Sequence, residues 1–164
     1  MPTTHSVLDS PVGPLTLIAT DGVLSAVLMS AHRHPRLDRG VRDDAALAPA
    51  RDQLAEYFAG ERTVFDLPLA PQGSPFERRV WAELQQIPYG RTRSYGELAR
   101  ALGRPRAAQA VGAANGRNPV AIVIPCHRVV GADGALTGYA GGLERKRQLL
   151  ELENPTLLSP PALF

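Results

Sequence analysis

Residues 124–129 read Ile-Pro-Cys-His-Arg-Val and contain the only cysteine of the chain, followed directly by one of its four histidines. The run before the cysteine, residues 120–124, reads Val-Ala-Ile-Val-Ile, a pattern typical of a buried strand. This stretch therefore predicts a cysteine presented at the end of an apolar strand. Such a thiol acts as a nucleophile when a base or a positive charge stabilises its thiolate.

His127 is the nearest candidate for that base, but adjacent side chains of an extended chain point to opposite faces. A turn or a bridging water is then needed between Cys126 and His127. The imidazole also needs a partner on its other nitrogen to fix its tautomer, and a carboxylate on the last predicted helix could provide one. For the dipeptide alone, the simpler interpretation is a buried cysteine beside an unrelated histidine.

The composition limits the possible classes of protein. A chain of 164 residues with 44% hydrophobic residues can form one good-sized domain or two small ones around a packed core. One cysteine excludes an internal disulfide framework and a zinc site built on several thiolates. His32 and His34 lie in a polar stretch with no cysteine or carboxylate cluster, so we predict no metal and no cofactor.

The sequence has no apolar run long enough for a membrane span and no secretory pattern in its first 30 residues. We therefore expect a soluble protein of a reducing compartment, which predicts a cytoplasmic location and no membrane partner.

Charge is unevenly distributed along the chain although the net charge is only +2. Residues 1–71 carry a net charge of −3, and residues 72–164 carry +5. Between residues 84 and 132, seven arginines are accompanied by a single acidic residue, Glu97. This asymmetry fits a polyanion partner, but an Arg-rich solubilising surface explains it equally well.

Residues 1–71 are predicted to form a scaffold domain, a small antiparallel sheet with one helix. Pro and Gly turn signals separate short β-rich runs, and an apolar stripe marks the helix. The expected elements are strands at 5–9, 14–20, 23–30 and 63–67 and a helix at 44–59. Residues 31–42 are predicted to be an exposed loop.

Residues 72–164 are predicted to form a second, mainly helical domain. Ser74-Pro-Phe-Glu77 and Ser94-Tyr-Gly-Glu97 are capping boxes that mark the starts of two helices. The expected helices span 74–86, 94–102, 106–115 and 143–153, and the last is expected to pack through Leu143, Leu149, Leu150 and Leu152. The fold class is thus α/β in the α+β arrangement.

The second and third of these helices, joined by a short Gly-containing turn, are typical of a helix-turn-helix. The third helix is rich in Ala and Gly, so its backbone can approach a partner closely. A packed pair of helices needs small residues too, but the flanking arginines favour nucleic acid.

Together these motifs resemble the O6-alkylguanine-DNA alkyltransferase (methylated-DNA–protein-cysteine methyltransferase) family. The resemblance rests on Asn118-Pro119, on the 124–129 stretch and on Gly138-Tyr-x-Gly-Gly142, and it extends from about 74 to 153. A weaker match, Asp9-Ser-Pro-x-Gly13, suits the N-terminal domain of that family.

The resemblance implies direct DNA repair by a single-turnover cysteine S-methyltransferase. Such a protein binds duplex DNA through the minor groove, flips the damaged guanine out of the stack and transfers the alkyl group from O6 to cysteine. The substrate is then double-stranded DNA containing O6-alkylguanine and, as a second lesion, O4-alkylthymine. A monomer in solution is expected.

The resemblance also implies roles for individual residues. Cys126 corresponds to the acceptor nucleophile, His127 to its base through a water, and Glu153 to the carboxylate that orients His127. Asn118 would brace the turn, and Tyr95 and Lys146 would protonate or polarise the departing guanine. The base pocket would be lined by Val129, Tyr139, Ala140 and Gly141. DNA contacts are expected from Arg91, Arg93, Arg104, Arg106, Ala107, Gln109, Ala110, Ala113, Arg117 and Arg128.

The sequence departs from the family at two of these positions. Gln109 stands where an arginine usually fills the gap left by the flipped base, so we expect weaker or slower base extrusion, with Arg106 in part compensating. Ala140 stands where some relatives have serine, a mild change if only its backbone contacts the base.

Three alternatives remain open. A thiol hydrolase using Cys126 and His127 would turn over repeatedly on acyl substrates. A non-catalytic lesion-binding relative is disfavoured because such proteins lack the cysteine. A helix-turn-helix regulator would bind a specific sequence without covalent chemistry.

Overall fold

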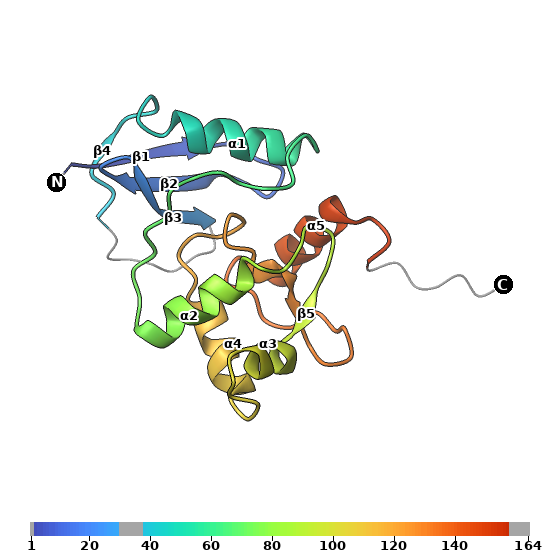
Figure 1. The fold of residues 1–164 in the computed structure, drawn as a ribbon. Helices are drawn as coiled ribbons and strands as arrows, with labels where there is room; N and C mark the ends of the chain where they lie inside the picture. The colour runs from blue at the N-terminus through green and yellow to red at the C-terminus, as the bar shows by residue number, and fades with distance from the viewer. Residues whose placement is uncertain (1, 30–37, 158–164) are drawn as a thin grey trace.

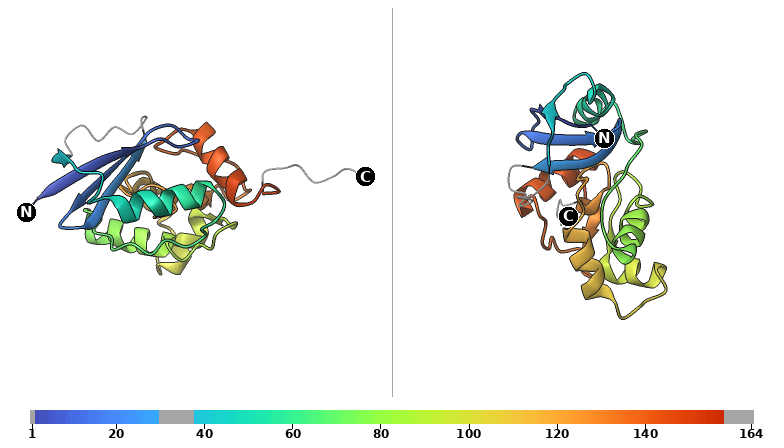
Figure 2. Two further views of the ribbon diagram at one scale, coloured as in Figure 1. Left: turned by 90° about the horizontal axis from the view of Figure 1, so that it is seen from above. Right: turned by 90° about the vertical axis from the view of Figure 1, so that its left-hand side faces the viewer.

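The computed structural model describes residues 2–29 and 38–157. A small sheet with helix α1 lies at one end of the molecule, helices α2, α3 and α4 lie at the other, and α5 lies between them (Figure 1). The view from the side shows the same order from the sheet to α4 (Figure 2). His32, His34 and most of the predicted 31–42 loop lie outside the described residues.

The N-terminal part contains the predicted three-stranded antiparallel meander. Its strands are β1 (Thr3–Leu8), β2 (Leu15–Thr20) and β3 (Val23–Met29). Asp21 and Gly22 both have positive φ, 52° and 77°, as a tight hairpin with the twist of its strands requires. A short fourth strand, β4 (Val41–Arg42), pairs in parallel with β1, so the sheet is mixed and the prediction of a purely antiparallel sheet was incomplete.

Helix α1 (Ala48–Phe58) begins four residues later than predicted. The preceding residues form turns, in which the Asp43 carboxylate accepts the backbone N–H of Ala46. The stripe of α1 is buried through Leu54 and Tyr57, which join the core formed by Leu15 and Leu17 of the sheet.

The strand predicted at 63–67 is not formed. The side-chain amide of Gln53 bonds both the N–H and the C=O of Asp66, at 2.8 and 2.9 Å, and so occupies groups that a strand would use. The chain rejoins the sheet only at Leu69, which forms an isolated parallel bridge with Leu24.

The C-terminal part contains the four predicted helices. They are α2 (Pro75–Leu84), α3 (Tyr95–Ala101), α4 (Ala108–Gly116) and α5 (Leu143–Glu153). Both predicted capping boxes are present. The hydroxyls of Ser74 and Ser94 each accept the backbone N–H of the glutamate three residues later, and the carboxylate of that glutamate accepts the backbone N–H of the serine. A minimal parallel ladder, β5 (Arg93–Ser94) with β6 (Val129–Val130), joins the start of α3 to the cysteine segment.

The apolar run 120–124 is not the predicted strand. Val120 forms one bridge with Val27 of β3, and the chain then turns tightly through Ile122, whose φ is 73°. The side chain of Asn118 satisfies this turn, because its amide donates to the Ile124 carbonyl at 2.8 Å and its oxygen accepts the Val120 N–H at 3.0 Å. The run has the apolar pattern of a strand because it is buried throughout. The N–H groups of Val123 and Ile124 are nevertheless bonded within the run, and the Ala121 N–H donates to the Val27 carbonyl of β3 at 3.2 Å.

One hydrophobic core extends through both parts of the chain. Trp81 of α2 is 1% exposed and donates its indole N–H to the Ala114 carbonyl of α4 at 2.8 Å. On α5, Leu149 and Leu150 are buried as predicted, but Leu143 is 50% exposed and Lys146 is buried instead. Among residues 2–29 and 38–157, no helix has the length and apolar content to cross a bilayer.

Candidate active site

Cys126 is the first residue of η1 (Cys126–Arg128), a single turn of 3-10 helix that ends the 120–125 turn. The thiol is 4% exposed and the imidazole of His127 is fully buried. Successive side chains of a 3-10 helix are about 120° apart rather than opposite. The turn therefore removes the difficulty that an extended chain would impose on a Cys–His pair.

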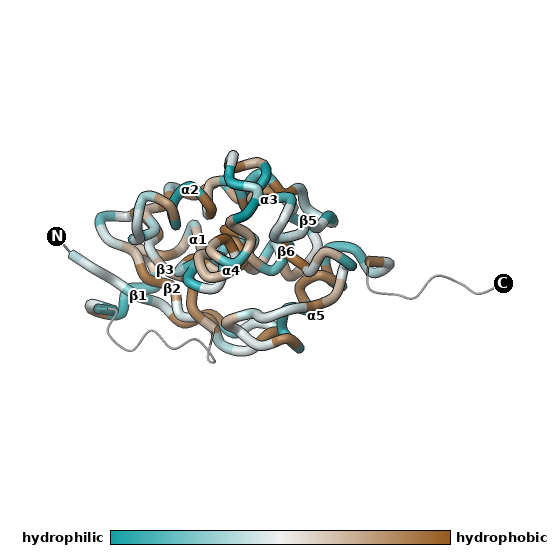
Figure 3. Tube along the Cα trace, turned by 90° about the horizontal axis from the view of Figure 1, so that it is seen from below, coloured by the Kyte–Doolittle hydropathy of each residue, from teal (hydrophilic) through white to brown (hydrophobic). Residues whose placement is uncertain are grey.

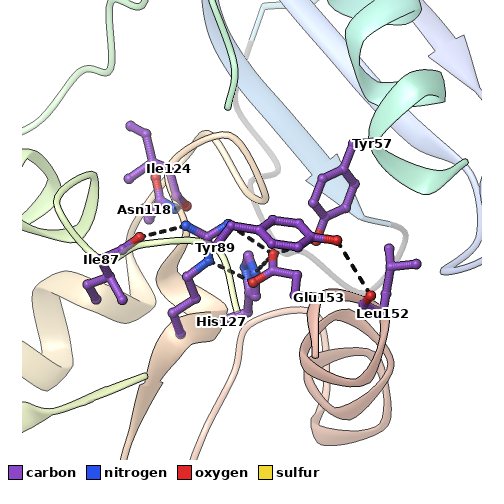
Figure 4. Close-up of polar contacts among 9 residues, drawn as sticks. Tyr57, Ile87, Tyr89, Asn118, Ile124, His127, Leu152 and Glu153 are labelled. Carbon is purple, nitrogen blue, oxygen red and sulfur yellow. Dashed lines mark hydrogen bonds and ion pairs between the residues drawn. The ribbon is translucent and has the colours of Figure 1, made fainter. Parts of the chain in front are cut away.

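Glu153, the last residue of α5, is the common partner of the buried polar groups. Its Oε2 lies 2.6 Å from Nε2 of His127 and 2.6 Å from the hydroxyl of Tyr57, and Arg128 binds both of its oxygens, at 2.8 and 3.0 Å. Figure 4 shows these side chains converging from α1, η1 and α5. The four residues come from three segments that are far apart in sequence.

The carboxyl of Glu153 is ionised. Burial acts to raise its pKa, but the hydrogen bonds and charges of His127 and Arg128 outweigh burial and lower the pKa to about 2. The positive charge of Arg128 is by itself a sufficient reason for a lowered pKa of Glu153, because a guanidinium keeps its charge at any ordinary pH.

The ionised carboxylate also fixes the tautomer of His127. A carboxylate only accepts hydrogen bonds, so Nε2 must carry the hydrogen and Nδ1 is left as the basic nitrogen. Burial lowers the pKa of His127, with the charges of Arg128 and Lys146 adding to it and Glu153 opposing it. Nδ1 is buried and has no hydrogen-bond partner among the described residues. The geometry thus presents a neutral imidazole with a free lone pair.

Arg128 does not lie on the DNA-facing surface, where the sequence analysis placed it. Its side chain is buried against Glu153 and donates to the Ile87 carbonyl at 2.7 Å, and its guanidinium lies 5.7 Å from the ring centre of Tyr89. A guanidinium with these partners is not available to a phosphate. The prediction of a DNA contact for Arg128 was wrong because sequence shows the charge but not its burial.

Two asparagines support the turn that carries the thiol. Asn118 holds the Ile124 carbonyl, as predicted for a bracing residue, and Asn115 at the end of α4 donates to the Cys126 carbonyl at 3.4 Å. Both are buried, at 1% and 4% exposure. They connect the end of α4 directly to the cysteine, and the sequence analysis missed Asn115.

The thiol of Cys126 is protonated at rest. Burial raises its pKa above the ordinary value of 9.0, while hydrogen bonds from Asn118 and Tyr139 and the charge of Lys146 act in the opposite direction. Burial likewise raises the pKa of Tyr139, whose hydroxyl is enclosed beside the sulfur. A nucleophile in this state needs a base that removes its proton during the reaction.

The residues predicted to act on the leaving group meet at Thr137. Lys146 donates its ammonium to the Thr137 carbonyl at 2.8 Å, and the Thr137 hydroxyl donates to that of Tyr95 at 2.9 Å. Burial lowers the pKa of Lys146 to about 8. A hollow lies beside this group, lined by Tyr95, Ala108, Gln109, Gly112, Gly131 and Thr137.

The four predicted pocket residues come from two segments, β6 and residues 139–141 before α5. Val129 is fully buried in β6, and Gly141 is so tightly packed that a β-carbon there would lie 2.4 Å from the sulfur of Met29. Tyr139 is partly buried and Ala140 is exposed. Tyr139 thus places its hydroxyl beside the Cys126 sulfur, whereas Ala140 lies at the surface.

The other predicted DNA contacts belong to the C-terminal part, whose helix α4 faces the viewer in Figure 3. Arg93 and Ala107 are partly buried. The exposed members are Arg91, Arg104, Arg106, Gln109, Ala110, Ala113 and Arg117. On α4, the exposed face is thus formed by Gln109 and small residues, with arginines at both ends.

Tyr57 is, with Asn115, a polar member of the site that was not predicted from the sequence. It appears in the sequence as part of an apolar helix stripe, and it contacts a residue 96 positions away. No local pattern marks such a contact.

Fold and site together define a class of protein: a buried cysteine next to a His–Glu pair, joined through Asn115 to a pair of helices, α3 and α4, in a helix-turn-helix arrangement. Comparison with known families narrows this class. A family model described as "6-O-methylguanine DNA methyltransferase, ribonuclease-like domain" matches residues 4–71. A second, "6-O-methylguanine DNA methyltransferase, DNA binding domain", matches residues 75–155.

Individual relatives agree with this result over nearly the whole chain. The methylated-DNA–protein-cysteine methyltransferase of Mycobacterium tuberculosis is 51% identical over 161 residues, 98% of each chain. A crystal structure of M. tuberculosis O6-methylguanine methyltransferase has a TM-score of 0.84 at 49% identity, covering 98% of this chain and 97% of the other. M. tuberculosis OGT in complex with DNA also has a TM-score of 0.84, at 51% identity over 93% of both chains. This chain belongs to the methylated-DNA–protein-cysteine methyltransferase family.

Proposed function

We propose that this protein repairs duplex DNA directly by transferring the alkyl group of O6-alkylguanine to Cys126, once per molecule. The observation that carries the proposal is the buried Cys126–His127–Glu153 arrangement placed directly behind the helix-turn-helix. Its M. tuberculosis relatives at about half identity carry the methyltransferase name, and one of them is described in complex with DNA.

In the proposed reaction, Nδ1 of His127 takes the thiol proton of Cys126 through a water. The Glu153 carboxylate stabilises the imidazolium that forms, because it carries a negative charge and accepts the hydrogen bond of the Nε2–H group. The sulfur attacks the alkyl carbon, the S–C bond forms, and the C–O6 bond breaks with its electron pair passing to the guanine. Tyr95 or Lys146 supplies a proton or a hydrogen bond to the departing base, which is otherwise a poor leaving group.

The product is a thioether, which water does not cleave as it cleaves a thioester. One molecule therefore removes one alkyl group and is consumed. This outcome separates the proposal from a thiol hydrolase, which would release its acyl group and turn over.

The buried thiol implies that the damaged base comes to the protein. A base in the duplex cannot reach a sulfur that is 4% exposed, so we propose that the base is flipped, at a cost of a few kcal/mol. α4 would lie in the minor groove, where its small exposed residues allow close approach, and Arg91, Arg104, Arg106 and Arg117 would contact phosphates. Gln109, on the exposed face of α4, would fill the gap in the stack.

The remaining expectations stay predictions. They are action on O4-alkylthymine, a monomeric state, a cytoplasmic location and a division into domains at residues 71 and 72.

The deciding experiment measures the intact mass of the protein after mixing with a duplex that carries one O6-methylguanine. We expect a gain of one methylene, mapped to Cys126 and limited to one per chain, with restored guanine in the DNA. The Cys126→Ala variant is the control, expected to bind the duplex without gaining mass. Restored guanine with unchanged protein mass would indicate turnover chemistry, and an intact lesion would leave a DNA-binding protein without repair activity.

A further inference from the structure

Oε2 of Glu153 accepts three hydrogen bonds, and one of them comes from the N-terminal part of the chain. We propose that Tyr57, on α1, is a positioning residue for the catalytic base: its hydroxyl holds the Glu153 oxygen that in turn holds His127. This inference rests on the proposed function. It assigns the sheet-and-helix part a positioning role in the reaction, beyond the scaffold role predicted from the sequence.

The contact has the geometry of a strong, fixed hydrogen bond. The Tyr57 side chain is fully buried, and its hydroxyl lies 2.6 Å from Oε2, the same distance as Nε2 of His127. Burial and the neighbouring Glu153 raise the pKa of Tyr57 far above its ordinary value, so the hydroxyl stays protonated and donates. O–H···O⁻ bonds of this length are among the stronger hydrogen bonds in proteins.

The ring of Tyr57 is held so that its hydroxyl cannot search for another partner. It packs against Phe58, Phe65 and Tyr89, with centroid distances of 5.1, 5.5 and 6.2 Å. These rings come from α1, from the connection that follows it and from the loop before β5. Helix α1 therefore holds Glu153 at the end of α5 through the Tyr57 side chain, which points toward Glu153 in Figure 4.

The bond acts on His127 through the charge of the carboxylate. Three donors share the negative charge of Oε2, which makes it a weaker acceptor for the imidazole hydrogen. Without the Tyr57 hydroxyl, the carboxylate would attract that hydrogen more strongly, the imidazolium would be favoured, and the pKa of His127 would rise. The imidazole would also lose part of its orientation, because Arg128 would be the remaining side chain that positions the Glu153 carboxylate for it.

The other ionisable groups around His127 do not replace this contact. Arg128 is already bonded to both oxygens of Glu153, and Lys146 is bonded to the Thr137 carbonyl. The Cys126 thiol and the Tyr139 hydroxyl lie beside each other. The hydroxyl of Tyr89 points to the Leu152 carbonyl at 3.5 Å.

Tyr89 provides a matched control. It is a tyrosine of the same aromatic cluster and loses the same atom when changed to phenylalanine, but it makes no hydrogen bond to Glu153. The experiment compares Tyr57→Phe, Tyr89→Phe and the unmodified protein. The rate of methyl transfer from an O6-methylguanine duplex is measured by intact mass from pH 5 to pH 9, together with thermal stability and the affinity for undamaged duplex.

For Tyr57→Phe we expect a rate at neutral pH reduced on the order of tenfold, because a hydrogen bond to a charged group changes an equilibrium by at least that factor. The acidic limb of the rate profile should move to higher pH, since a more basic His127 is protonated earlier. DNA affinity should be unchanged. Tyr89→Phe should follow the profile of the unmodified protein.

Two results would overturn the inference. One is a Tyr57→Phe profile that coincides with that of Tyr89→Phe. The other is a rate lowered equally at every pH together with a lower melting temperature, which indicates a purely structural role. If the unmodified protein transfers no methyl group at all, the proposed function fails instead, and the two failures are thus distinguished.

Discussion

Arg128 binds both carboxylate oxygens of Glu153, at 2.8 Å from Nε and 3.0 Å from Nη2, in a site where both side chains are buried. The arginine directly follows the Cys-His pair, and the glutamate ends the last helix. The pair therefore ties the cysteine turn to α5, and it keeps the carboxylate charged for His127.

Removal of Arg128 should therefore lower the free energy of unfolding, and it should not weaken the binding of DNA phosphates. Arg128→Met leaves a buried carboxylate without its main charge partner, which typically costs about 3–5 kcal/mol. Urea unfolding at neutral pH measures the loss. The control is Arg106→Met on the exposed surface, expected to leave stability within about 0.5 kcal/mol and to weaken binding in a salt-dependent way. Equal stability of the two variants would show that Arg128 is not structural.

Glu153 should make the protein sensitive to acid. Its pKa falls from 4.5 in the unfolded chain to about 2 in the fold, so the unfolded state binds more protons between these values. The stabilisation is complete above about pH 4.5 and is lost as the pH falls toward 2. The free-energy difference between the unmodified protein and Glu153→Gln, followed by denaturation from pH 6 to pH 2, should therefore shrink through this range. A constant difference would contradict the assignment.

The buried ammonium of Lys146 should destabilise the fold at neutral pH, although the proposed reaction uses this group. Burial lowers its pKa from 10.5 to about 8, so the fold favours the neutral amine and gains stability as the pH rises from 8 through 10.5. Lys146→Met should be more stable than the unmodified protein at pH 7, by roughly 2 kcal/mol after the loss of the Thr137 bond, and this advantage should shrink as the pH rises from 8 to 10.5. Its methyl-transfer rate should fall at least ~10-fold. A variant with full activity would remove Lys146 from the proposed mechanism.

Gln109 should limit how the protein engages damaged DNA. Gln109→Arg adds a charge to the exposed face of α4, so the salt dependence of DNA binding should steepen by about one ion. We also expect faster methyl transfer, measured by intact mass, because a longer cationic side chain fills the gap in the stack and attracts phosphate. Gln109→Ala is the control for loss of the amide. If arginine leaves affinity and rate unchanged, the glutamine is not a limitation.

The sequence alone was enough to predict much of the fold. Both helix starts with capping boxes occur where Ser74 and Ser94 predict them, because a cap needs only residues three positions apart. The Asp21-Gly22 hairpin is equally local. The family was also readable from the motif around Cys126, and the comparisons confirm it.

The tertiary structure decided which groups surround the thiol. A buried apolar run has the same sequence pattern in a strand as in a turn. In residues 120–124 the turn forms, and the side chain of Asn118 bonds the Val120 N–H and the Ile124 carbonyl within it. In the sequence, Arg128 cannot be told from the exposed arginines, and only the fold buries it against Glu153. Tyr57 donates to the same carboxylate although it is 96 residues away in sequence. Caps and hairpins depend on neighbours in sequence, whereas the charge and hydrogen bonds of a buried site depend on residues that folding alone brings together.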